Sequence, residues 1–505
     1  MSASTSLARR AALALALLIC FYVGAILVSA LLLLIAYWSV FNAGHTFGTL
    51  KLAFFCVVGA GIILWSILPR FDKFQAPGPQ LDGADQPELF GTIRELADAT
   101  KEEMPSEVYL IPDVNAWVAQ RGGILGIGGR RVMGIGLPLM QILTVSQLRA
   151  VLAHEFGHYY GGDTRLGPVI YNLRGAIYRT VTNLARRRSI LQAPFAWYGE
   201  RALKLTHGVS RQQELAADEL AANLVGAKPL SDALQTIHVG AMLYPPYLQS
   251  EVSPVLGAGF RPGLAAGFSM FLSAPSIQKA AAEVVREEIA SGKENPFDSH
   301  PPLRDRVNAL AALGRGETAS GESPATTLLR NLDALETELL ARATGRPELK
   351  SWHFVGWESL AETVYLPAWT RGAEECAQAL NGVRPKDFPA ISGDLIAFGK
   401  RITPPKGWLP SGDDWAELAT RSIGAAFAVR LHQKGWALET SPGRLVQFRN
   451  GTFSVRVFSV LLELNSGELT AENWLKLCSE SEISDLDLGA SASTLAPSTT
   501  SPPGE

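Results

Sequence analysis

The fold of this 505-residue chain is decided by the stretch 144-TVSQLRAVLAHEFGH-158. It opens with a Thr-x-x-Gln capping box, because the Thr144 hydroxyl and the Gln147 side chain can bond the unpaired N–H groups at a helix start. Gly161 and Gly162 tolerate the left-handed conformation in which helices end. We therefore expect one helix from Thr144 to these two glycines.

The stretch ends in an H-E-x-x-H motif. On a helix, His154 and His158 share one face, so both imidazoles can reach one Zn²⁺ ion. Glu155 is rotated by about 100° from His154, where it can hold a metal-bound water and act as general base and then general acid. With 8 His residues in the chain, a chance match is expected in fewer than about one chain in a hundred.

The third metal ligand has to come from elsewhere in the sequence. A metzincin site would need a third His at position 164, which is Thr164. The best carboxylate candidate lies in 210-SRQQELAAD-218, where Glu214 can ligate zinc and Asp218 can orient a ligating imidazole. A Ser-x-x-Gln capping box predicts that this helix begins at Ser210. The weaker carboxylate candidates are Asp163, Glu200 and Glu219.

The first 71 residues are much more hydrophobic than the rest of the chain. They contain no Asp or Glu and only four Lys or Arg residues. The apolar run 11–38 exceeds the roughly 20 residues that cross a bilayer, and a second run covers 52–68. A cleaved signal peptide fits poorly, because its apolar core is only about 7–15 residues long. We expect a two-helix membrane hairpin. Its flanking basic residues place both termini, and everything after residue 73, in the cytoplasm: Arg9, Arg10, Arg70 and Lys73.

A basic stretch follows the zinc motif. Residues 164–199 contain six Arg and no acidic residue, with an apolar stripe at helical spacing. Such a helix suits an anionic membrane surface, but an ordinary surface helix packed on its own core has the same pattern. Both interpretations stay open here. The stripe consists of Ile170, Leu173, Ile177, Val181 and Leu184.

The rest of the sequence predicts short strands and further helices. We expect a helix at 87–100 and strands at 107–111, 117–120 and 132–136. The Gly-rich segment 122–129 lacks a phosphate-binding ending and is interpreted as a hairpin loop. Further expected elements are a helix ending near 342, a helix at 413–433, and a hairpin whose strands 445–448 and 452–457 flank Asn450-Gly451.

Four motifs, in order along the chain, carry a resemblance to one family. The sequence resembles the HtpX-like membrane zinc metallopeptidases, which are related to the CAAX prenyl proteases. The resemblance covers residues 87–312 and the amino-terminal hairpin. HtpX has two further membrane segments after its zinc motif, for which this sequence shows no clear equivalent. The motifs are 114-VNAW-117, 147-QLRAVLA-153 leading into H-E-x-x-H, 210-SRQQELAAD-218, and 299-SHPP-302 with Arg306.

The resemblance implies roles for particular residues. It implies one Zn²⁺ per chain, held by His154, His158 and Glu214, with Glu155 as the catalytic residue. It also implies an endopeptidase at the cytoplasmic face of the inner membrane, acting on membrane proteins in quality control.

Three more residues receive less definite roles from the resemblance. His300 and Arg306 would lie near the active site. His300 can stabilise an oxyanion, approach the zinc as an inhibitory ligand, or cap a helix that begins at Pro301. Asn115 would lie on an edge strand that pairs with extended substrate, or in a turn.

The favoured function is a membrane-anchored zinc endopeptidase that contacts the lipid bilayer and a protein substrate. The alternative is a membrane adaptor or chaperone with a latent or structural zinc site, closed by a fourth ligand such as His300. A prenyl-protein processing enzyme would need a larger helical chamber than two spans build. The net charge of −3 gives no basic footprint for nucleic acid.

We therefore expect an α+β, mainly α chain with a zincin-type domain that contains a small sheet. Its carboxy-terminal module holds seven of the eleven Trp residues and has no assigned role. The expected segments are a membrane hairpin (1–73), a linker (74–86), a zinc metallopeptidase domain (87–312), a linker and helix (313–345), a Trp-rich α+β module (346–486) and a disordered tail (487–505).

Overall fold

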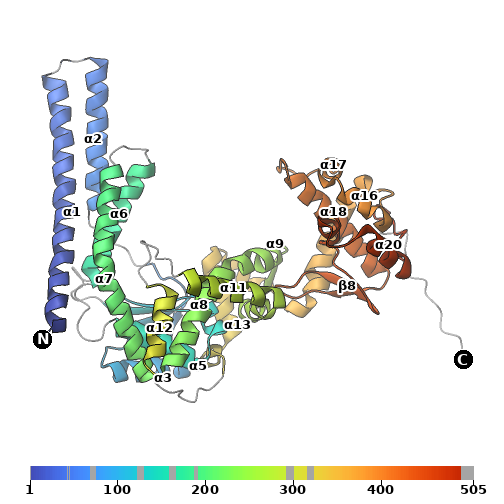
Figure 1. Cartoon of the computed structure of the whole chain (residues 1–505), viewed down its shortest axis with the longest axis horizontal. Coiled ribbons are helices and arrows are strands. Elements are labelled where there is room, and N and C mark those ends of the chain that lie inside the picture. The colour runs from blue at the N-terminus through green and yellow to red at the C-terminus, as the bar shows by residue number, and fades with distance from the viewer. Residues whose placement is uncertain are drawn as a thin grey trace, which may run out of the picture. The chain divides into compact units, whose positions relative to one another are not determined.

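The structure is a computed structural model, and Figure 1 shows a mainly helical chain with small sheets, which confirms the expected fold class. The chain divides into two compact units. The first contains residues 1–243 and 281–347, and the second contains residues 244–280 and 348–505. The described residues are 2–42, 44, 46–68, 75–121, 130–158, 167–186, 192–291, 301–314 and 323–490.

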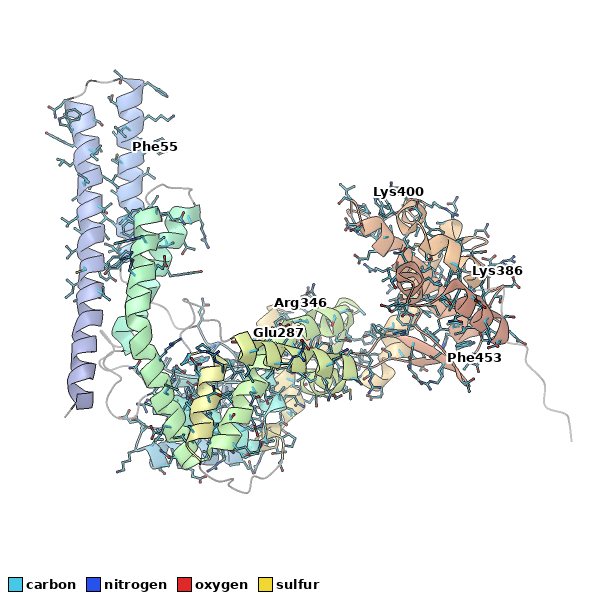
Figure 2. All side chains as sticks on the ribbon, in the orientation of Figure 1. Phe55, Glu287, Arg346, Lys386, Lys400 and Phe453 are labelled. Atoms are coloured by element: carbon cyan, nitrogen blue, oxygen red, sulfur yellow. The ribbon has the colours of Figure 1, made fainter. Side chains whose placement is uncertain are left out.

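The first unit begins with two long apolar helices, α1 (Ser2–Phe41) and α2 (Phe47–Ile67), which pack side by side (Figure 1). Within the described residues, two helical segments are long and apolar enough to cross a membrane, Ile19–Phe41 and Phe47–Ile67. Their outward faces are apolar, and Phe55 of α2 points away from α1 (Figure 2). The expected two-helix hairpin is therefore present.

The basic stretch forms α6 (Gly167–Arg186), and α7 (Gln192–Leu224) follows it. The described part of its apolar stripe packs on α1 and α2: Ile177 and Leu184 share one buried cluster with residues of α1, α2 and α7. The side-chain amide of Asn183 donates a hydrogen bond to the Ser66 hydroxyl of α2 over 2.9 Å. Helix α6 therefore packs on α1 and α2.

A four-stranded sheet lies in the first unit, in the order β1-β2-β4-β3. Strands β2 and β4 are parallel, while β3 and β4 pair antiparallel as far as Arg121 and Arg130. This pairing supports a hairpin connection, although the loop 122–129 itself lies outside the described residues. The bounds are β1 (Gln80–Leu81), β2 (Glu107–Ile111), β3 (Ala116–Arg121) and β4 (Arg130–Gly136), so the three expected strands are confirmed.

Helices α3 and α5 pack together beside this sheet, and α5 also contacts β3. The capping box that opens α5 is confirmed: the Thr144 hydroxyl accepts the Gln147 N–H over 3.3 Å, and Gln147 Oε1 accepts the Thr144 N–H over 2.9 Å. Helix α5 ends at Gly157, and Gly161 and Gly162 lie outside the described residues. The helices here are α3 (Pro87–Thr100), α4 (Leu137–Ile142), α5 (Val145–Gly157), α8 (Ala227–Tyr247), α11 (Pro275–Ser291), α12 (Leu303–Ala312) and α13 (Leu332–Thr344).

The expected helix start at Ser210 is wrong. Ser210 lies in the interior of α7, which runs without interruption from Gln192 to Leu224. A capping Ser needs an extended backbone, but Ser210 keeps a helical backbone even though weak helix formers, Thr206, Gly208 and Val209, precede it. Packing of the first half of α7 on the membrane helices supports the same continuity.

The second unit has its own aromatic core around α18 (Asp414–Gln433), in which Phe388 stacks on Trp474. The hairpin at Asn450-Gly451 is confirmed, with Gly451 at a φ of +57°. Figure 2 labels Phe453 on the second strand of this hairpin. The sequence did not predict the third strand, β7. The strands are β5 (Phe260–Pro262), β6 (His353–Val355), β7 (Ala437–Glu439), β8 (Gln447–Asn450) and β9 (Phe453–Val455).

Two findings sharpen the limits of the carboxy-terminal module. Segment 244–280 groups with it, because β5 pairs with β6 and the Trp357 indole N–H donates to the Gly263 carbonyl over 2.8 Å. At the other end, Leu488 is buried and its N–H donates to the Val383 carbonyl. Packed structure therefore continues beyond position 486. The remaining helices are α9 (Ser253–Gly257), α10 (Leu264–Ser273), α14 (Leu366–Glu375), α15 (Ala377–Leu380), α16 (Phe388–Ser392), α17 (Leu395–Gly399), α19 (Val460–Ser466) and α20 (Ala471–Glu480).

Candidate metal centre

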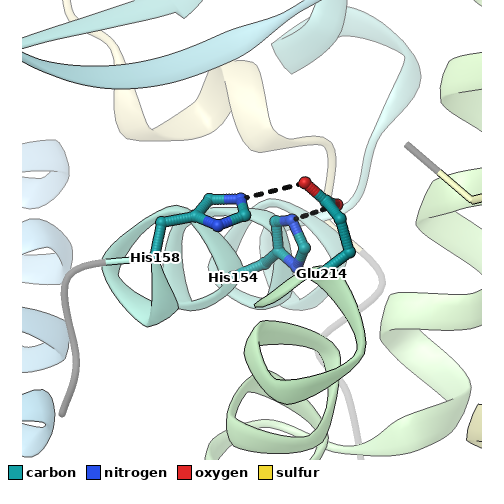
Figure 3. A group of neighbouring side chains, drawn as sticks. All are labelled: His154, His158 and Glu214. Carbon is teal, nitrogen blue, oxygen red and sulfur yellow. Dashed lines mark ion pairs between the residues drawn. The ribbon is translucent and has the colours of Figure 1, made fainter. Parts of the chain in front are cut away.

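Two helices bring three potential metal ligands together. His154 lies in the last turn of α5, His158 follows its last residue, and Glu214 comes from α7 (Figure 3). His154 Nε2 is 3.5 Å from Glu214 Oε2, and His158 Nε2 is 3.6 Å from Glu214 Oε1. Among the described residues, this trio is the group of His, Cys, Asp and Glu side chains that can hold a metal ion, with one ligand atom of each within 4.8 Å of the others.

The spacing and chemistry of these atoms fit zinc. Two ligands bound tetrahedrally at about 2.0–2.1 Å lie about 3.4 Å apart, and each imidazole Nε2 stands near that distance from one Glu214 oxygen, His154 from Oε2 and His158 from Oε1. Two imidazole nitrogens and one carboxylate oxygen form a common set at catalytic zinc sites, which leaves a fourth position for a water. The His158 side chain is 28% exposed, whereas His154 and Glu214 are buried, so solvent can reach the cluster beside His158.

Asp218 orients the first of these histidines. It lies one helical turn after Glu214 on α7, and its Oδ1 is 2.9 Å from His154 Nδ1. With Nδ1–H donating to Asp218, the imidazole presents Nε2 to the cluster.

Arg306 of α12 clamps Asp218 from the other side. Its Nε donates to Asp218 Oδ2 over 2.8 Å and its Nη2 donates to Oδ1 over 2.6 Å, while Nη1 lies 3.8 Å from Glu214 Oε2. Both Arg306 and Asp218 are buried. Burial would raise the pKa of Asp218, but the Arg306 and His154 hydrogen bonds lower it below its usual value. The guanidinium therefore holds a buried carboxylate ionised next to the ligand cluster.

The carboxylates around His154 favour the protonated form of its imidazole. Burial is the largest influence and lowers the pKa of this imidazole, but hydrogen bonds to Asp218 and Glu214 together raise the pKa to about 9. His154 is therefore an imidazolium at neutral pH, donating toward both carboxylates. Metal binding needs the neutral ring and must release this proton.

We expect zinc affinity to increase from neutral pH to about pH 9, by up to about tenfold per pH unit from His154 alone. Because the pKa of folded His154 is raised, its contribution to the stability of the metal-free chain is complete below 6.5 and is lost as pH rises through about 9. Competition titrations with a chelator, corrected for the protonation of the chelator, measure the affinity. An affinity that stays constant across this range would contradict the proton on His154.

Gly157 lets the two ligand-bearing helices approach each other. A Cβ at this position would stand 2.9 Å from the Ala217 Cα and 3.0 Å from its Cβ. Ala217 lies between Glu214 and Asp218 on α7, so the closest contact of α5 and α7 coincides with the cluster. Sequence reasoning treated this Gly as a variable position of the motif. The available signal was a Gly inside a helix, which usually has a packing reason.

Gly157→Ala is expected to destabilise the chain by about 1–3 kcal/mol and to weaken zinc binding, because α5 and α7 must move apart. Denaturant unfolding and metal competition measure the two effects. Gly91→Ala is the matched control: Gly91 lies inside α3 with open space at its Cβ, so this change should stabilise by about 0.5–1 kcal/mol. Equal effects of the two substitutions would contradict the packing role of Gly157.

The other candidate residues lie apart from the cluster or outside the described chain. Asn115 is exposed and immediately precedes β3, the last strand of the four-stranded sheet, and its carbonyl accepts the Gly136 N–H. Glu200 and Glu219 are exposed on α7. Asp163 and His300 lie outside the described residues, and α12 begins at Leu303 rather than at Pro301. His300, the possible fourth ligand of the latent-site alternative, therefore lies outside the part of the chain that the structure describes.

Comparison with known proteins agrees with the geometry. Residues 84–313 match the family described as Peptidase family M48. The chain is 26% identical over 288 residues to "Protease HtpX" of Idiomarina loihiensis, which covers 52% of this chain and 87% of that protein. It is 25% identical over 251 residues to "Protease HtpX homolog" of Arthrobacter sp., covering 46% and 73%. No solved structure matches the chain.

Proposed function

Since residues 84–313 form an HtpX-like peptidase family M48 domain, we propose that the chain is a membrane-anchored zinc endopeptidase. The observation that carries the proposal is the ligand trio itself. Glu214 of α7 meets both histidines of the H-E-x-x-H motif at separations that suit tetrahedral zinc. The two apolar helices α1 and α2 supply the membrane anchor.

The proposed role of each residue follows from the position of its side chain. Bound zinc supplies Lewis acidity toward the attacking water and the peptide carbonyl. Glu155 follows His154 on α5 and is partly exposed, so its carboxylate can accept the proton of the attacking water and return it to the leaving amine. His154, His158 and Glu214 hold the metal, with His154 kept in the required tautomer by Asp218.

Arg306 has a supporting electrostatic role in this proposal. Glu155, Glu214 and Asp218 place three carboxylates around one site, and their mutual repulsion has to be offset when the metal is absent. Burial would lower the pKa of Arg306, but the hydrogen bond and charge of Asp218 raise it, with smaller contributions from Glu214 and Glu155. The guanidinium is thus a permanent positive charge within this group.

The sheet next to α5 offers a surface for substrate. Strand β3 is the last strand in the order of the four-stranded sheet and contacts α5. We propose that an extended peptide aligns along β3, with exposed Asn115 at the end of that strand, and crosses the metal centre. The flanking basic residues of the anchor support a cytoplasmic orientation, and membrane proteins undergoing quality control are the proposed substrates.

Reversible metal dependence tests the proposal. The purified full-length chain in detergent or vesicles is incubated with an unfolded membrane protein, and fragments are followed by mass spectrometry. We expect internal cleavage that stops with a zinc chelator and returns when one equivalent of zinc per chain is restored. Cleavage that persists after complete removal of the metal would overturn the proposal.

A further inference from the structure

One helix connects the membrane anchor with the metal centre. Near its start, the Tyr198 hydroxyl of α7 donates a hydrogen bond to the Leu17 carbonyl of α1 over 2.6 Å. Sixteen positions later, the same continuous helix presents Glu214 to the two histidines. At 1.5 Å per residue, these two points lie about 24 Å apart along the helix axis. Figure 1 shows α7 extending from beside the hairpin to the part of the first unit that contains α5.

The contacts that α6 and α7 make with α1 and α2 lie at one end of both membrane spans. Ser66, which bonds Asn183, stands one residue before the end of the second span, Phe47–Ile67. Phe21 and Ala25 of α1 share a buried cluster with Ile63 and Ile67 of α2, so Leu17, one turn before Phe21, lies at the level where the second span ends, although the apolar run of α1 extends back to residue 11. Tyr198, which bonds Leu17, therefore lies near the membrane face at which the second span ends.

Exposed aromatic side chains mark the same level. Trp197, next to Tyr198, is 58% exposed, and Tyr178, next to the Ser66 contact of Arg179, is 72% exposed. The Arg201 guanidinium lies 4.8 Å from the centre of the Trp197 ring. Trp and Tyr favour the headgroup region of a bilayer, and an Arg beside them can reach lipid phosphates. These residues agree with a membrane face at Tyr198.

We propose that α7 is a fixed spacer that holds the metal centre up to about 24 Å outside the membrane face, so that membrane-anchored substrates are cleaved only at bonds several residues beyond the bilayer. An extended chain covers at most about 3.3–3.6 Å per residue, so roughly seven residues span the full distance. Any tilt of α7 lowers this number. The inference rests on the proposed peptidase function and adds a rule for substrate selection.

A series of anchored substrates tests the spacer. The full-length protein is placed in vesicles with substrates that carry one membrane helix, a Gly-Ser segment of roughly 2 to 12 residues, and a sequence that the protein cuts in a soluble peptide. We expect the cleavage rate to increase at least about tenfold between the shortest segment and about eight residues, and then to level off. Equal rates at every length would overturn the spacer while leaving the peptidase function intact. Failure to cut any soluble peptide would overturn both.

Variants of the protein test whether α7 sets the threshold, which is the segment length at which cleavage becomes fast. A Gly-Ser-Gly-Ser insertion after Lys204 interrupts the helix, and the same insertion at Gly44, between α1 and α2, is the matched control. We expect the variant with the Lys204 insertion to cleave the shortest substrate at least about tenfold faster than the variant with the Gly44 insertion. Both variants should still cleave the soluble peptide. An unchanged threshold would contradict the proposal. If soluble-peptide cleavage is lost, Tyr198→Phe replaces the insertion; it removes the bond to Leu17, and it too must lower the threshold.

Discussion

Glu155→Gln is expected to lower the cleavage rate by about 10²–10⁴-fold while the bound metal stays in place. The amide has nearly the shape of the carboxylate but cannot accept the proton of the attacking water. Glu155 does not belong to the ligand trio, so its replacement leaves the three donor atoms unchanged. Initial rates on a soluble peptide and the zinc content of the same preparation measure the two quantities.

Glu219→Gln is the matched control for this substitution. Glu219 is an exposed carboxylate on α7, the helix that also carries Glu214. We expect the control to retain both the wild-type rate and the metal. Undiminished cleavage by the Glu155 variant would remove this residue from the mechanism. Loss of metal in that variant would show that Glu155 contributes to metal binding.

Arg306→Ala is expected to destabilise the chain by about 3–5 kcal/mol, since it leaves a buried carboxylate without its cation. Asp218 is only 2% exposed and receives two hydrogen bonds from Arg306. Without Arg306, the pKa of Asp218 should rise, which favours the protonated carboxyl. A protonated Asp218 orients His154 poorly. Zinc affinity should therefore decrease together with stability. Denaturant unfolding of the detergent-solubilised chain, with and without zinc, separates the two losses.

Two further substitutions make this test specific. Arg304→Ala, on the same helix, removes a partly exposed ion pair with Asp305 and should change the stability by at most about 1 kcal/mol. Arg306→Lys keeps the charge but cannot form the bidentate hydrogen bonds to Asp218, so we expect a loss of stability between those of the two alanine variants. If the alanine variants at 304 and 306 are equally stable, Arg306 has no special electrostatic role.

The sequence was most informative where the signal is local. The capping box at Thr144 and the turn at Asn450-Gly451 each depend on a few neighbouring residues, and both are present in the structure. The spacing of His154 and His158 on one helix face is local in the same sense. Glu214 was selected from its motif and family resemblance, and the structure brings it to both histidines.

The features that the sequence did not predict depend on contacts between distant segments. The Thr-x-x-Gln pattern starts a helix at Thr144, but the similar Ser-x-x-Gln pattern does not start one at Ser210, because α7 is already helical there and its first half packs on α1 and α2. The approach of Gly157 to Ala217 and the bidentate pair of Arg306 with Asp218 also join separate helices. A single sequence does not record which helix faces meet.

The zinc content of the purified chain, measured by elemental mass spectrometry beside that of Glu214→Ala, shows whether the three side chains hold zinc. We expect one zinc per wild-type chain, held by His154, His158 and Glu214. The variant should retain less than about a tenth of that amount, since two imidazoles alone bind zinc weakly. A wild-type chain without metal, or a variant with a full complement of zinc, would contradict the proposed zinc site.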